Sequence, residues 1–123
     1  MKNVLIIEDD GWLADSYAHC LSQRGFEVRT VASAETAMDQ IDEAMPDIVV
    51  ADIILGRQNA LTLLHELQSY ADTAALPVIV CTGLSLSARE KRNLSRYGVV
   101  EVFDKAVLRP EVLADAVDVH TRE

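Results

Sequence analysis

Five short apolar runs alternate with five longer helical patterns along this 123-residue chain. The apolar runs have the length of β-strands and cover residues 3–8, 26–31, 47–52, 78–82 and 99–103. The helical patterns cover residues 11–24 and 34–45, a segment with Leu61, Leu64 and Leu67, a segment from the Ser87 and Glu90 capping box to Gly98, and a segment from Pro110 onward. Strands that alternate with helices in this way form a parallel sheet. The sequence therefore predicts an α/β fold with a five-stranded parallel sheet and five helices on its two faces.

Charged residues in two of the strands indicate the strand order. Glu27 and Arg29 alternate through the second strand and Glu101 interrupts the fifth, whereas the first, third and fourth strands are continuously apolar. Continuously apolar strands are flanked on both sides, so the second and fifth strands are expected at the edges. The doubly wound order 2-1-3-4-5 satisfies this pattern. Its ligand crevice lies at the carboxyl ends of the strands, between strands one and three.

Two further helices carry clear starting signals. Asp10 stands directly before Gly11 and the first helix, where an aspartate side chain caps free backbone N–H groups. Pro110 stands where the last helix begins, a position that favours proline. The apolar spacing of this last helix predicts an inward face of Val112, Leu113, Ala116 and Val117.

Composition restricts the possible functions. The length fits a single domain over residues 1–123, and the net charge of -9 with 11 scattered basic residues gives no basic face, so direct nucleic-acid binding is not expected. No apolar stretch approaches the roughly 20 residues that span a bilayer, so no membrane association is expected. Cys20 and Cys81 lie in apolar patterns that are typical of small buried thiols. These features favour a soluble cytoplasmic protein.

Polar side chains gather at the predicted carboxyl ends of four strands. They are Glu8, Asp9 and Asp10 after the first strand, Asp52 after the third, Thr82 at the end of the fourth and Lys105 after the fifth. Any one of them alone is more often a turn, cap or surface residue. Carboxylates, a hydroxyl and an ammonium group that converge on one crevice can hold a hard divalent cation and a phosphoryl group.

Magnesium needs six oxygen ligands and keeps several waters, so a few protein oxygens suffice. We assign Asp9 and Asp52 as direct ligands, Glu8 as a ligand through water and the carbonyl of Ile54 as the backbone oxygen. Asp52 is also the expected nucleophile, because a carboxylate can accept a phosphoryl group as an acyl phosphate. The remaining two side chains would contact that group: Thr82 by a hydrogen bond and Lys105 by its charge.

With these residues the sequence resembles a receiver domain of two-component response regulators over essentially its whole length. The resemblance rests on the segments Val4 to Asp10, Pro46 to Asp52, Leu76 to Gly83 and Phe103 to Lys105. It implies a flavodoxin-like fold and Mg²⁺-dependent phosphorylation of Asp52 by a histidine kinase or histidine phosphotransfer protein, within a two-component system or phosphorelay. Phosphorylation would then shift conformation and the binding of a downstream partner or fused output domain. Such a domain signals, and its own catalysis is limited to self-phosphotransfer and slow autodephosphorylation.

Three places depart from the family pattern, and one of them is the loop after Asp52, where Gly56 and Asn59-Ala60 replace the usual proline and acidic-glycine turn. Val102 stands where many members carry a switching aromatic residue, and Ala106 replaces the proline that usually follows Lys105. These departures keep open a receiver-like interaction module that is regulated without phosphorylation. A small aspartyl-phosphate phosphatase fits less well, because that class needs an Asp-x-Asp motif and the first strand ends in Glu8-x-Asp10.

Overall fold

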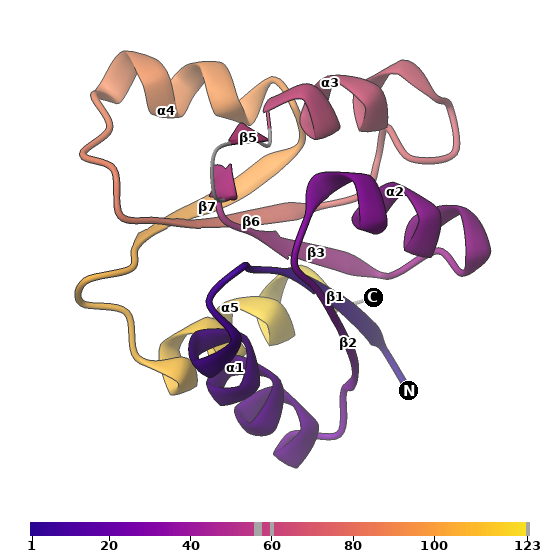
Figure 1. The fold of residues 1–123 in the computed structure, drawn as a ribbon, viewed down its shortest axis with the longest axis vertical. Coiled ribbons are helices and arrows are strands. Elements are labelled where there is room, and N and C mark those ends of the chain that lie inside the picture. Colours follow the sequence, from indigo (N-terminus) through magenta and orange to yellow (C-terminus); the bar gives the residue numbers. More distant parts are fainter. Residues whose placement is uncertain (56–57, 60, 123) are drawn as a thin grey trace.

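Five parallel strands form the central sheet of the computed structural model, which describes residues 1–55, 58–59 and 61–122. The strands are β1 (Asn3–Ile7), β2 (Glu27–Val31), β3 (Ile48–Ala51), β6 (Val78–Thr82) and β7 (Val99–Asp104). Their spatial order is β2-β1-β3-β6-β7, with every neighbouring pair parallel (Figure 1). This confirms the predicted order 2-1-3-4-5 and places β2 and β7, the strands with charged residues, at the edges.

Two further strands form a small antiparallel pair outside the central sheet. It consists of β4 (Ile54–Leu55) and β5 (Gln58–Asn59) and forms its own two-stranded sheet. The periodicity of the sequence did not predict it, because strands of two residues carry no alternating pattern. The pair follows β3 directly and precedes α3.

Five helices cover the two faces of the sheet, as the alternation predicted. They are α1 (Gly11–Gln23), α2 (Ala34–Glu43), α3 (Leu61–Ser69), α4 (Ala88–Ser95) and α5 (Pro110–His120). Helices α1 and α5 pack on one face, and α2, α3 and α4 pack on the other (Figure 1). In the part of the chain that the structure describes, no helix is both long and apolar enough to cross a bilayer.

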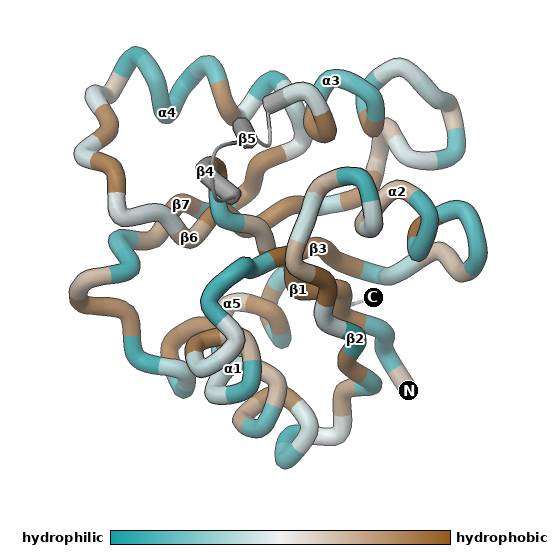
Figure 2. Tube along the Cα trace, in the orientation of Figure 1, coloured by the Kyte–Doolittle hydropathy of each residue, from teal (hydrophilic) through white to brown (hydrophobic). Residues whose placement is uncertain are grey.

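Side chains of the central strands alternate between two separate hydrophobic cores. Val4 and Ile6 of β1 join the core under α1 and α5, whereas Leu5 and Ile7 join the core under α2, α3 and α4. The same alternation places Ile48 and Val50 of β3 in the α1/α5 core. Figure 2 shows the strongly hydrophobic strands β1 and β3 at the centre of the molecule. Both strands therefore direct apolar side chains to both faces of the sheet, and the polar side chains stand at the strand ends.

The predicted helix starts are confirmed, whereas α1, α2 and α4 end slightly before the predicted residues 24, 45 and 98. An Asp10 carboxylate oxygen accepts hydrogen bonds from the backbone N–H groups of Trp12 (3.0 Å) and Leu13 (3.2 Å), so this residue caps α1. Ser87 and Glu90 form the capping box of α4, with both hydrogen bonds at 3.1 Å. Gly98, after α4, has φ +82°, a backbone conformation that residues with a Cβ rarely adopt.

Candidate functional site

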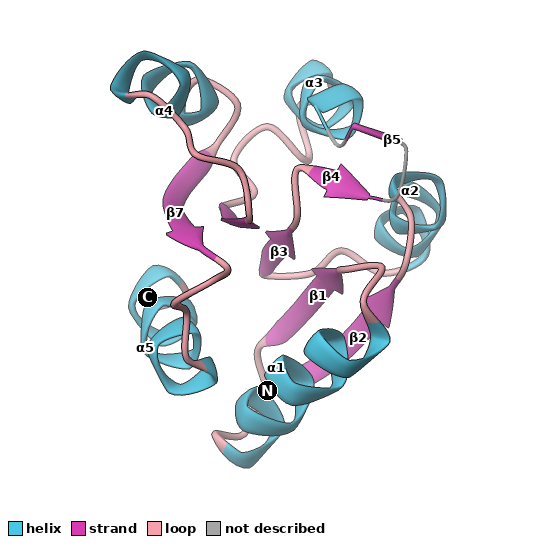
Figure 3. Cartoon of the chain, turned by 60° about the vertical axis from the view of Figure 1, so that its left-hand side comes forward, coloured by secondary structure: helices cyan, strands magenta, loops and turns pink. Residues whose placement is uncertain are grey.

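Backbone hydrogen bonds extend the parallel sheet one residue beyond the ends of β1 and β3. The N–H of Glu8 donates to the carbonyl of Val31 (3.0 Å), and the N–H of Asp52 donates to the carbonyl of Ile7 (3.1 Å). Because side chains alternate along a strand, Glu8 and Asp52 follow Ile6 and Val50 on the face that α1 and α5 cover. Figure 3 shows β1 and β3 ending at the same edge of the sheet. Both carboxylates are buried there, with 5% and 8% of their surface exposed.

Lys105 joins these two carboxylates from the far side of the crevice. Its Nζ lies 2.6 Å from Oε1 of Glu8 and 2.8 Å from Oδ2 of Asp52. Its backbone N–H donates to the carbonyl of Thr82 (2.9 Å), which fixes the loop after β7 to the end of β6. The peptide bond to Ala106 is trans, like every peptide bond of the described residues. One ammonium group therefore bridges two buried carboxylates that come from different strands, and its single charge offsets only part of theirs.

Burial and pairing shift the pKa values of Glu8 and Lys105. Burial raises the pKa of Glu8, and this outweighs the opposing hydrogen bonds from Lys105 and from the N–H of Asp10. Burial alone would lower the pKa of Lys105, but its hydrogen bonds to Asp52 and Glu8 hold that pKa above its usual value. Lys105 therefore carries its charge at neutral pH.

The acidic cluster has the donor set of a hard cation site. Glu8, Asp9 and Asp52 each bring one carboxylate oxygen to within 4.8 Å of the others. Asp9 is exposed, whereas the other two are buried, so the group opens to solvent on one side. Three carboxylates at this spacing suit a divalent ion that keeps several waters. Ile54 stands two residues after Asp52 as the first residue of β4, and its role as a carbonyl ligand stays a prediction.

Thr82 is the last residue of β6, which neighbours β3 on the side away from β1 and Glu8. Only 2% of its surface is exposed, and its hydroxyl oxygen accepts a hydrogen bond from the N–H of Leu84 (3.1 Å). An open cavity of about 440 Å³ is lined by Asp52, Thr82, Gly83, Leu84, Lys105 and Ala106. The structure thus brings the three predicted phosphoryl-contacting residues together around one space.

Val102 lies behind this cavity on β7. The side chain is half-buried and packs against the core under α2, α3 and α4. It lines a smaller hollow of about 140 Å³ together with Thr82 and residues of the loop after β6. A valine fills this place without a ring that could exchange between two positions.

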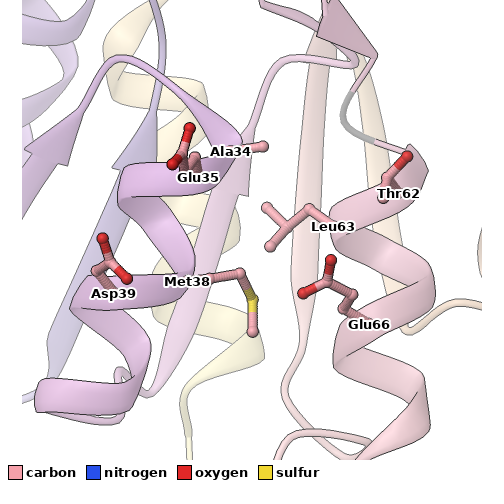
Figure 4. A pocket seen from close by; sticks show the side chains of 7 residues that line it. All are labelled: Ala34, Glu35, Met38, Asp39, Thr62, Leu63 and Glu66. Atoms are coloured by element: carbon pink, nitrogen blue, oxygen red, sulfur yellow. The ribbon is translucent and has the colours of Figure 1, made fainter.

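A third hollow of about 500 Å³ lies between α2 and α3, away from these residues (Figure 4). Its lining residues are Ala34, Glu35, Met38, Asp39, Thr62, Leu63 and Glu66. None of them belongs to the predicted site, and no basic side chain stands among them. The volume of a cavity alone therefore does not identify the functional site of this molecule.

Two residues behind the cluster were not recognised as neighbours of the site in the sequence. Tyr17 of α1 and Cys81 of β6 both belong to the α1/α5 core, on the face from which Glu8 and Asp52 project. Burial raises the pKa of the Cys81 thiol to about 12, and the charges of Glu8 and Asp52 add to this effect. Cys20, expected to be buried, is only half-buried, because it stands at the edge of the inner face of α1.

This difference between the cysteines predicts selective labelling. In the native protein at pH 8, a disulfide-exchange reagent should modify Cys20 quickly, and Cys81 should react only after unfolding, because the thiolate is the reactive form. Counting released chromophore with and without denaturant gives one and then two reactive thiols per chain, and Cys20→Ala should abolish the fast reaction. Two fast thiols in the native parent would show that the packing around Cys81 is open in solution.

Comparison with known proteins agrees with this architecture. Residues 4–118 match the response regulator receiver domain. The transcriptional regulatory protein MalR of Bacillus subtilis is 36% identical over 107 residues, which cover 85% of this chain and 44% of MalR. Protein-glutamate methylesterase/protein-glutamine glutaminase 1 of Anaeromyxobacter dehalogenans is 30% identical over 103 residues, 83% of this chain and 29% of that protein. The chain thus spans less than half the length of either relative.

A solved structure shares the fold over nearly the whole chain. Chemotaxis protein CheY4 of Vibrio cholerae superimposes with a TM-score of 0.86 at 20% identity and covers 97% of this chain and 98% of its own. At this identity the likeness concerns the fold. Because the family match extends over residues 4–118, the chain belongs to the response regulator receiver domains of two-component signal transduction.

Proposed function

We propose that this chain is a phosphoacceptor receiver in which Asp52 takes a phosphoryl group from a phosphohistidine. The donor would be a histidine kinase or a histidine phosphotransfer protein of a two-component system or phosphorelay. The observation that carries the proposal is the joint placement of Glu8, Asp52 and Lys105, which form two close ion pairs beside Asp9 at the carboxyl ends of the strands. A crevice at this edge is where doubly wound folds bind their ligands.

In the proposed transfer, a carboxylate oxygen of Asp52 attacks the phosphorus of the donor phosphohistidine. A P–O bond forms and the P–N bond breaks, and its electron pair returns to the imidazole nitrogen, which takes up a proton. Lys105 offsets the negative charge of the arriving group, and the Thr82 hydroxyl donates a hydrogen bond to a phosphoryl oxygen. The product is an aspartyl phosphate on this chain, so the reaction is a self-modification and not the turnover of a free substrate.

Magnesium fits the carboxylates that surround Asp52. Asp9 and Asp52 would hold the ion directly, Glu8 through water, and the carbonyl of Ile54 would supply a backbone oxygen. When bound, the ion neutralises part of the negative charge that the carboxylates and the phosphoryl group bring together. Glu8 and Asp52 are also the two ion-pair partners of Lys105, so the ammonium group and the cation would both offset the charge of these carboxylates.

Phosphorylation would act by shifting a conformational equilibrium and, through it, partner binding. Residues 1–123 would form one receiver domain that works in the cytoplasm, signals to a downstream protein or fused output domain, and binds no nucleic acid itself. The names of the relatives include a transcriptional regulator and a methylesterase, and those whole-protein activities belong to those proteins. The chain's own catalysis would be self-phosphotransfer and slow autodephosphorylation.

Removal of the metal is expected to slow phosphorylation by about a hundredfold or more, because a bound cation contributes several kcal/mol of charge stabilisation. The parent is treated with acetyl phosphate in MgCl₂ or in EDTA, and incorporation is followed by intact mass. Asp9→Asn should resemble the EDTA sample even in MgCl₂. Asp39→Asn, an exposed carboxylate of α2, is the matched control and should behave like the parent.

Two other outcomes of this experiment would replace the proposal. Absence of phosphate on the parent in MgCl₂ would favour an interaction module that is regulated without phosphorylation. Continued turnover of external phosphate esters would favour a phosphatase.

A further inference from the structure

Helix α4 carries a stripe of arginines on its outer side. Arg89, Arg92 and Arg96 follow one another at spacings of three and four residues, so their side chains start within about 60° of one another around the helix. Leu94, the buried residue of α4, lies on the opposite side. All three arginines are exposed, and none of them makes an ion pair in the part of the chain that the structure describes. The scattered positions of the basic residues along the sequence did not reveal this stripe.

Helix α2 carries a stripe of the opposite charge. Glu35, Asp39 and Asp42 follow one another at spacings of four and three residues, and all three are exposed. The arginine stripe and the carboxylate stripe therefore have the same length, about 10.5 Å of helix. Helix α3 lies between α2 and α4 (Figures 1 and 3), and among the described residues no ion pair joins the two stripes within one chain.

The surface beside the carboxylate stripe is hollowed and partly apolar. The hollow of about 500 Å³ between α2 and α3 adjoins a further one of about 480 Å³, because Met38 and Glu66 line both. Met38 and Leu63 point into the space between the two helices (Figure 4). Met45 and Tyr70 line the further hollow with 43% and 56% of their surface exposed. Methionine adapts to the shape of a bound group, and a tyrosine ring can hold a guanidinium group against its face.

We propose that this seam between α2 and α3 binds helix α4 of a second copy of the chain. The three arginines of one copy would lie along Glu35, Asp39 and Asp42 of the other, each of which lines one of the two hollows. The arginine stems would cover the apolar lining, and their guanidinium groups would pair with the carboxylates. Because the two stripes have the same length, all three pairs can form at once. The contact does not involve Asp52, so it is independent of the proposed phosphorylation.

The net charge of -9 on each copy opposes this association. Charges more than about 10 Å apart are largely screened at about 0.1 M salt, whereas the paired groups would be in direct contact. Each exposed ion pair contributes little, so three of them together should strengthen the association by about tenfold. The contact is therefore weak and reversible, and it depends on protein concentration.

Sedimentation equilibrium in about 0.1 M NaCl, at protein concentrations up to about 1 mM, tests the contact. The average mass of the parent should rise above the 13.5 kDa of a single chain as its concentration increases. The association should be about tenfold weaker in two triple variants, each of which removes one stripe. They are Glu35→Gln with Asp39→Asn and Asp42→Asn, and Arg89→Gln with Arg92→Gln and Arg96→Gln.

The matched control removes three exposed carboxylates from α1, β2 and α5 by the substitutions Asp15→Asn, Glu27→Gln and Glu111→Gln. It changes the net charge by the same amount as the α2 variant, so the lower repulsion should leave its association equal to that of the parent or stronger. A parent that stays a single chain at every concentration would overturn the inference. Equal association of the α2 variant and the control would also overturn it, because the contact would then lie elsewhere.

An exchange of charges tests the pairing itself. One variant combines Glu35→Lys, Asp39→Lys and Asp42→Lys, and the other combines Arg89→Glu, Arg92→Glu and Arg96→Glu. Each alone should remain a single chain, since like charges would then face one another. An equal mixture of the two should associate, because opposite charges meet again at the contact. A mixture that does not associate would contradict the pairing of α4 with α2.

Discussion

Replacing Lys105 by methionine is expected to lower the free energy of unfolding at pH 7 by about 3 kcal/mol, because it leaves two buried carboxylates without their cation. The side chains of Glu8 and Asp52 are 3% and 9% exposed, and that of Lys105 is 17% exposed, so water cannot replace the lost ammonium group fully. Methionine has an unbranched apolar side chain like the stem of lysine, so the main change is the loss of the ammonium group with its charge and hydrogen bonds. Urea denaturation of the parent and the variant measures the difference.

The same variant should change how stability depends on pH. The folded-state pKa of Lys105 lies above its ordinary value of 10.5, so its stabilising contribution is complete below pH 10.5 and is lost as pH rises beyond it. Lys105→Met should lack this alkaline loss. For Glu8 the sign is opposite: its folded pKa is raised, so protonation at acidic pH favours the folded state. The variant should therefore recover part of its lost stability as pH falls.

Magnesium ions provide a further check on this explanation. The carboxylates of Glu8 and Asp52 no longer contact an ammonium group in Lys105→Met and should bind Mg²⁺ more readily than in the parent, so MgCl₂ should stabilise the variant more. Lys91→Met, an exposed lysine of α4, is the matched control and should change stability by no more than about 0.5 kcal/mol. If Lys105→Met were no more destabilised than Lys91→Met, the two ion pairs of Lys105 would not be significant in solution.

The order of the strands could be predicted because edge strands tolerate charge. Glu27, Arg29 and Glu101 marked β2 and β7, and both lie at the edges. The prediction of the inward face of α5 was partly wrong. Val112, expected to face inward, is 40% exposed, and Ala114 is fully buried instead. Leu113, Ala114, Ala116 and Val117 define a face whose centre lies about 120° from Val112 around the helix. The greater hydrophobicity of Val112 suggested that it would be buried, whereas the geometry of the helix places the smaller Ala114 in the core.

The site could be predicted at the level of elements but not of contacts. Strand ends placed Glu8, Asp52, Thr82 and Lys105 at one edge, because parallel strands end together. The Glu8–Lys105 pair was not foreseen, since the sequence does not tell which of several carboxylates an ammonium group reaches. The sequence also did not show that the Tyr17 hydroxyl lacks a hydrogen-bond partner, because the helical spacing of this residue is that of an ordinary core residue.

The largest effect on function is expected for Asp52→Asn, which should abolish phosphorylation. Asparagine has nearly the same size and shape but presents an amide, which is a poor nucleophile and cannot form an acyl phosphate. Lys105 retains Glu8 as a partner in this variant, so the fold should persist and the loss should be one of chemistry. Far-UV circular dichroism and urea unfolding verify that the variant is folded before its reactivity is compared.

Intact-mass measurement after treatment with acetyl phosphate and MgCl₂ tests the assignment of Asp52 most directly. The parent should gain the mass of one phosphoryl group while acetate leaves, Asp39→Asn should do the same, and Asp52→Asn should gain nothing. Equal phosphate on Asp52→Asn, or none on the parent, would contradict the account of Asp52 as the phosphoacceptor of this chain.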